Sequence, residues 1–212
     1  MARPPSYHLI NRGAAAFATG EANAAVLAFA GTQSVWPNAH VDRRGPNTGV
    51  TSFLDVTPVS FPVLYPCDDL EYRSVFSIRR AKGRGRNESW SDTVLCAAVA
   101  NYNLAVSLQV LGRQKKDSLL LYQESLRILN TLTWNGGFKA VASLTVASLH
   151  NMAVILLDNQ ESHKAARLVT LAERVLSSWS METQLPLLDD ETHQLFSLLQ
   201  YFVQPVFAAP AA

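Results

Sequence analysis

The chain has only two cysteines, Cys67 and Cys96, and almost no net charge. Two thiols cannot form a disulfide framework or, by themselves, a zinc site. We expect both to stay reduced, as in a reducing compartment, with Cys96 buried in an apolar helical stretch. A net charge of +1 with 17% charged residues excludes a strongly basic nucleic-acid binder and a charged disordered tail as descriptions of the whole chain.

Motifs of common catalytic sites are also missing. The sequence has no Gly-x-Ser-x-Gly, no phosphate-binding Gly-Lys-Ser/Thr loop and no dinucleotide fingerprint. The five histidines do not follow metal-ligand spacing. The acidic clusters at 68–71 and 189–191 fit a solvated loop and a helix start. We therefore expect no enzymatic activity, no cofactor and no metal site.

The first residues lack the apolar core of a signal peptide. Two uncharged spans, 93–112 and 140–157, are nearly long enough to cross a membrane. Each carries polar residues near its middle, which are costly in lipid but ordinary on a soluble helix. We expect buried helices of a cytoplasmic protein that does not contact a membrane.

The chain does contain an internal repeat. Residues 101–108 (Asn-Tyr-Asn-Leu-Ala-Val-Ser-Leu) and 150–156 (His-Asn-Met-Ala-Val-Ile-Leu) are nearly copies. Each begins a helical pattern that breaks at a polar turn, at Gly112 in the first and at 158–160 in the second. Repetition over tens of residues predicts stacked helical hairpins that bury their apolar faces against each other.

These positions resemble the tetratricopeptide repeat (TPR) family, whose unit is a helical hairpin with small residues at its helix contacts. The matching residues in three successive units are Gly13, Ala16, Gly20, Ala25 and Phe29; Leu104, Ala105, Leu108, Gly112, Ser118, Tyr122 and Ser125; and Met152, Ala153, Leu156, Ala165, Val169 and Ala172. Leu104 and Met152 are 48 residues apart, against about 34 for an ordinary unit. The layout looks like that of long-period, single-domain TPR proteins of uncharacterised role.

The resemblance implies an all-α fold, a TPR-like stack of about three antiparallel helical hairpins with a C-terminal capping helix. The expected parts are a first hairpin at 1–36, an irregular insert rich in Pro and Gly at 37–91, two long hairpins at 92–180, a capping helix at 181–204 and a Pro/Ala tail at 205–212. Within the insert, 51–56 and 72–78 have the composition of short strands.

In a TPR-like stack the first helix of each hairpin lines a concave groove. The expected groove residues are Tyr102, Asn103, Val106, Gln109, His150, Asn151, Val154 and Leu157. The amides of Asn103 and Asn151 are suited to hydrogen-bond the backbone of an extended peptide. The alternative is that both side chains bond local backbone or neighbouring helices. The groove is otherwise mostly apolar, which favours a hydrophobic peptide, a helix or the protein's own insert.

A basic run follows the second strand-like segment. It contains Arg79, Arg80, Lys82, Arg84 and Arg86 without an acidic residue. Such a run can grip phosphates in a salt-dependent way, but no aromatic residue is interleaved for base stacking. A solvated loop is the simpler interpretation.

The sequence thus predicts a non-enzymatic interaction module or adaptor that binds a peptide or helix of a protein partner in its groove. Two alternatives remain. One is nucleic-acid or acidic-surface binding through 79–86, and the other is a purely structural subunit whose groove is filled by its own insert or by a second copy.

Overall fold

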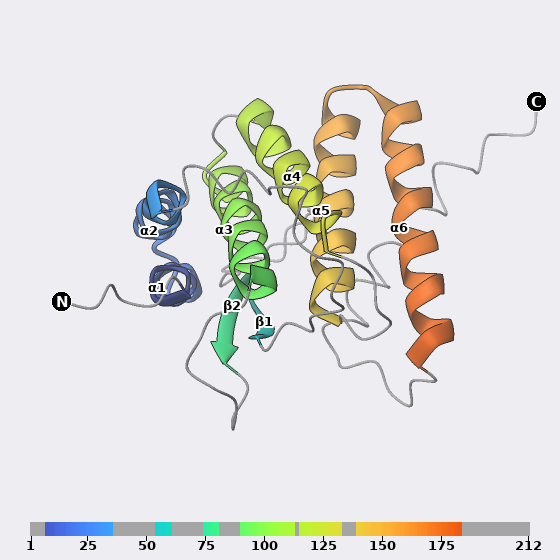
Figure 1. Ribbon diagram of the computed structural model, residues 1–212. Helices are drawn as coiled ribbons and strands as arrows, with labels where there is room; N and C mark the ends of the chain where they lie inside the picture. Colours follow the sequence, from blue (N-terminus) through green and yellow to red (C-terminus); the bar gives the residue numbers. More distant parts are fainter. Residues whose placement is uncertain are drawn as a thin grey trace, which may run out of the picture. The chain divides into compact units, whose positions relative to one another are not determined.

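The computed structural model describes residues 7–35, 54–60, 74–80, 90–112, 115–132 and 139–183. Of these residues 81% are helical, so the expectation of a mostly helical protein is confirmed. The elements in chain order are α1 (Tyr7–Ala18), α2 (Ala22–Val35), β1 (Leu54–Ser60), β2 (Ser74–Arg80), α3 (Trp90–Val110), α4 (Lys115–Leu129), α5 (Lys139–Asp158) and α6 (Ser162–Thr183) (Figure 1). Most of the predicted capping helix and the whole Pro/Ala tail lie outside the described residues.

By its contacts the chain forms two compact units. The first comprises residues 1–66 and 73–141, and the second comprises 67–72 and 142–212. The first unit therefore holds α1 to α4 and both strands, whereas the second holds most of α5 and all of α6.

In the first unit, α1 packs against α2 and α3 packs against α4. Helix α2 also packs against α3, which joins the two pairs (Figure 1). Gly13 lies at the α1–α2 contact, where a Cβ would come within 2.5 Å of the Phe29 ring. Between α3 and α4, the Ser125 hydroxyl donates to the Ala98 carbonyl at 2.9 Å. Small side chains at these points let the helices approach closely.

Helix α1 ends in a left-handed residue, Gly20, with φ 82°. The Gly20 N–H donates to the Phe17 carbonyl and the Glu21 N–H donates to the Ala16 carbonyl, which closes a Schellman motif. The Glu21 carbonyl then accepts from the Ala25 N–H, so α2 begins directly after the turn. A reversal this tight makes α1 and α2 an antiparallel pair.

Helix α5 ends in the same way, but with a non-glycine residue. Gln160 has φ 62°, its N–H donates to the Leu157 carbonyl, and the Glu161 N–H donates to the Leu156 carbonyl. The Glu161 carbonyl accepts from the Ala165 N–H at the start of α6. In α3 the left-handed residue is Gly112, with φ 65°, which confirms the predicted helix end.

The two strands lie in the predicted insert and pair antiparallel, with Pro58 opposite Phe76 and Ser60 opposite Ser74. They overlap the segments that sequence composition marked, but the predicted bounds were wrong: β1 runs four residues beyond 56, and β2 begins two residues after 72. Composition locates strands, whereas their ends depend on the partner strand.

Two helical spans, Ser91–Val110 and Ala140–Asp158, are long and apolar enough to cross a membrane by length and composition. In each window 78% of the residues are buried within the structure, and core helices of soluble proteins meet the same criterion. In the first unit, α3 contacts α2, α4 and β2. Cys96, on this helix, is a buried thiol as predicted.

Candidate functional site: a strand held by side-chain amides

Strand β2 lies beside α1 and α3 (Figure 1). Side chains from both helices bind its main chain. On α3, the Asn103 Nδ2 donates to the Phe76 carbonyl at 2.7 Å, and the Phe76 N–H donates to Asn103 Oδ1 at 2.7 Å. Both bonds are buried. A single planar amide therefore satisfies both main-chain groups of one strand residue.

Asn11 on α1 repeats this arrangement two residues further along the strand. Its Nδ2 donates to the Ile78 carbonyl at 2.7 Å, and the Ile78 N–H donates to its Oδ1 at 2.8 Å. The Tyr102 hydroxyl, next to Asn103, donates to the Ser74 carbonyl at 3.1 Å. Five hydrogen bonds thus hold residues 74, 76 and 78, and all of them go to the strand's main chain. We call these three helix side chains, from Asn11, Tyr102 and Asn103, the amide ladder.

Strand geometry explains the regular spacing of the ladder. Residues two apart in a strand point their N–H and C=O groups to the same edge, about 7 Å apart. Neighbouring helix axes lie about 8–10 Å apart, so one asparagine from each helix meets alternate strand residues. The other edge of β2 pairs with β1, through the intervening residues 75, 77 and 79. The helices take the place of a further strand.

The far edge of β1 carries a proline. Pro58 is opposite Phe76, whose N–H and C=O point to Asn103 and away from β1. This pair is therefore a non-hydrogen-bonded one, and position 58 faces the outer edge of β1. Because proline has no N–H, it weakens the pairing of any further strand there.

Side chains of β2 complete the apolar core of the first unit. Phe76 is 1% exposed, and its ring centre lies 5.2 Å from that of Tyr102. The Tyr102 ring centre lies 5.5 Å from that of Tyr122 on α4. Tilted aromatic pairs at these separations are favourable beyond the area that they bury. Ile78 is also fully buried, whereas Arg79 beyond it is exposed.

Four predicted groove residues lie on α3, and all are buried. Tyr102 and Asn103 bind β2, as described. Gln109 instead bonds within the helical pair, because its Oε1 accepts from the Tyr122 hydroxyl at 2.8 Å. Among the described residues, the Gln109 Nε2 is one of three buried side-chain polar atoms that have no hydrogen-bond partner. Val106 is buried on the same helix.

The other four predicted groove residues lie on α5, in the second unit. His150, Asn151 and Val154 are buried, and Leu157 is half-buried. In the basic run, Arg79 and Arg80 are the last residues of β2. Positions 82, 84 and 86 lie outside the described residues.

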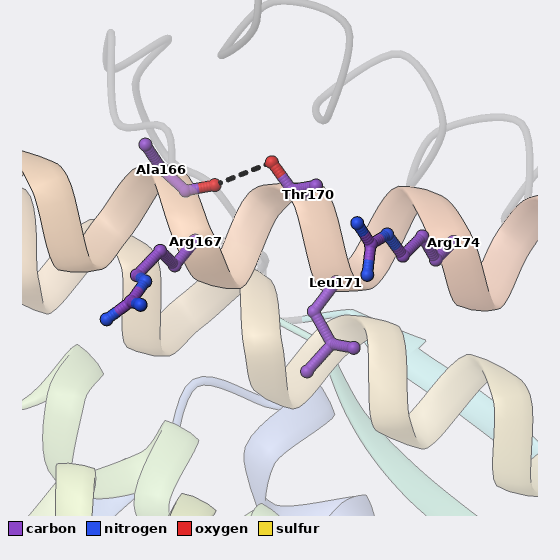
Figure 2. A pocket seen from close by; sticks show the side chains of 5 residues that line it. All are labelled: Ala166, Arg167, Thr170, Leu171 and Arg174. Atoms are coloured by element: carbon purple, nitrogen blue, oxygen red, sulfur yellow. Dashed lines mark hydrogen bonds between the residues drawn. The ribbon is translucent and has the colours of Figure 1, made fainter.

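A surface hollow borders α6 (Figure 2). The side chains that line it in the described part of the chain are Ala166, Arg167, Thr170, Leu171 and Arg174. Thr170 bonds only to the Ala166 carbonyl of its own helix, at 3.0 Å. Because Leu171 is 46% exposed and both arginines are exposed, the described lining of this hollow does not supply the buried polar groups of a ligand site. No group of three or more His, Cys, Asp or Glu residues that suits a metal ion occurs in the described ranges.

Sequence reasoning identified Asn103 but missed Asn11. The signal was present, because an asparagine stands two residues before the small residue of each repeat, at 11, 103 and 151. The occupant of the site was left open, since no local pattern links residues 27 and 67 positions apart. Comparisons with protein families, with curated proteins and with solved structures find no match to this chain.

Proposed function

We propose that the chain is a non-enzymatic, TPR-like interaction module whose inner helix face binds an extended main chain. In the protein by itself, that face holds its own strand β2. The observation that carries this proposal is the amide ladder, in which Asn11 and Asn103 bind alternate strand residues through both main-chain groups. Binding of this kind recognises an extended backbone, which is the mode of β-strand addition.

Burial at repeated positions supports the TPR-like assignment. The second helix of each pair carries three buried residues at i, i+4 and i+7, and the first helix carries a buried small residue. These residues are Gly13, Ala25, Phe29 and Thr32; Ala105, Ser118, Tyr122 and Ser125; and Ala153, Ala165, Val169 and Ala172. Equivalent burial in three helix pairs is expected of stacked copies of one unit.

The choice of asparagine also favours a binding face over ordinary helix packing. An apolar side chain at position 11 or 103 would leave the strand's N–H and C=O groups unsatisfied. The amide is needed only because an extended backbone lies against this face. Of the alternatives predicted from sequence, a groove filled by the protein's own insert agrees with these contacts. No described contact favours nucleic-acid binding through the basic run.

Site-resolved hydrogen exchange tests this proposal. The Phe76 and Ile78 amides are expected to exchange slowly in the full-length protein, because both donate to buried or half-buried asparagine oxygens. Asn103→Ala should speed exchange most at Phe76, and Asn11→Ala should do so most at Ile78. Equal, fast exchange at both amides in the unaltered chain would refute the proposal.

A further inference from the structure

The five hydrogen bonds described for the amide ladder do not involve the side chains of the strand that it holds. They join Asn11, Tyr102 and Asn103 to N–H or C=O groups of residues 74, 76 and 78. Any extended segment offers the same groups every second residue. The site therefore accepts a strand as a class of ligand, and β2 is one member of that class.

Side-chain pockets then select among strands. Ser74, Phe76 and Ile78 share one face of the strand, and all three are buried. The Phe76 pocket is aromatic, since its ring meets Tyr102 at 5.2 Å. On the opposite face of the strand, Val75 is fully buried, Ser77 is half-buried and Arg79 is exposed. The site fits the pattern small–aliphatic–aromatic–x–aliphatic, with little demand on the fourth residue of that pattern or on the residue after the last aliphatic one.

Strand β2 belongs to the same chain as the helices that hold it. A tethered strand competes at a high effective concentration, so a partner gains access only while β2 is released. Pro58 disfavours the other route, addition of a strand at the outer edge of β1.

We propose that β2 is a placeholder, and that a protein partner binds by replacing it with its own extended segment of the pattern small–aliphatic–aromatic–x–aliphatic. This inference rests on the proposed function, because it uses the same amide ladder. It adds the partner's chemistry and the step, release of β2, that precedes binding.

Fluorescence anisotropy with the full-length chain tests the placeholder. The probe is a labelled peptide with the sequence of residues 72–80. Phe76→Leu in the chain weakens the resident strand and leaves the ladder intact, so it should bind the peptide at least tenfold more tightly than the unaltered chain. Adding Asn103→Ala should reverse that gain, and a peptide with alanine in place of its phenylalanine should also lose at least tenfold. Arg79→Ala, at an exposed position, is the matched control and should change little.

The outcomes separate this inference from the proposed function. The placeholder proposal is refuted if neither chain binds the peptide at concentrations up to ~1 mM, or if Asn103→Ala leaves the affinity unchanged. Slow hydrogen exchange at the Phe76 amide would still support the proposed function in either case. If circular dichroism shows that the Phe76→Leu chain does not fold, the milder Ile78→Val replaces it. Light scattering that reveals a dimer formed by exchange of β2 would show that the site binds a second copy of this chain. That result would overturn the proposal of a different protein partner.

Discussion

Removing the Asn103 amide is the sharpest perturbation of this structure. Asn103→Ala deletes both partners of Phe76, whose N–H and C=O are buried. A buried donor or acceptor left unsatisfied costs about 1–3 kcal/mol, so two such groups cost roughly 2–6 kcal/mol. A water molecule that enters the vacated space would bring the loss of stability to the lower end of this range. Against a total of about 5–15 kcal/mol for a typical domain, this loss is large.

Urea unfolding followed by circular dichroism measures this cost. With a slope of about 2 kcal/mol per M, the midpoint should fall by roughly 1–3 M. Asn101→Ala is the matched control, because Asn101 is half-buried on the same helix and its amide donates to the Ala97 carbonyl one turn back, at 3.1 Å. We expect it to cost less than about 1 kcal/mol. Equal costs for the two variants would refute the role given to Asn103.

Three further predictions concern the helix pairs. Gln160→Gly should raise the stability by about 0.5–1 kcal/mol in urea unfolding, because glycine adopts the left-handed φ of 62° without a Cβ penalty; a lower midpoint would contradict this. Gly13→Ala should lower the free energy of unfolding by about 1–3 kcal/mol, because the added Cβ clashes with the Phe29 ring. Phe29→Leu in the same chain should recover part of that loss of stability. Tyr122→Phe should lower the free energy of unfolding by about 1–2 kcal/mol, because it removes the hydroxyl that donates to Gln109 Oε1. The double variant that also carries Gln109→Leu should lose less stability than Tyr122→Phe alone.

The helix pairs were largely predictable from sequence because their signals are local. The stripe through Leu104 and Leu108 marked α3, and the glycine at 112 marked its end, since both follow from the period and the stereochemistry of a helix. The end of α5 at Gln160 was harder, because glutamine rarely takes a left-handed conformation. There the polar turn at 158–160 served as the signal.

The strand-binding site was only half predictable. The amide of Asn103 was predicted to bind the extended backbone of a partner peptide, and in this structure it binds the main chain of the protein's own Phe76. Its occupant was left open between a partner's segment and the protein's own insert, because β2 reaches α3 through tertiary packing that no periodicity encodes. Asn11 was predictable from its register, because it stands two residues before Gly13 as Asn103 and Asn151 stand before Ala105 and Ala153.

The central claim, that helix amides bind the edge of β2, can be observed directly in an isotope-labelled sample. Scalar coupling across a hydrogen bond should connect the Phe76 amide nitrogen with the Asn103 side-chain carbonyl carbon, and the Ile78 nitrogen with that of Asn11. Coupling of either nitrogen to a main-chain carbonyl instead, or no coupling in a folded sample, would contradict the account.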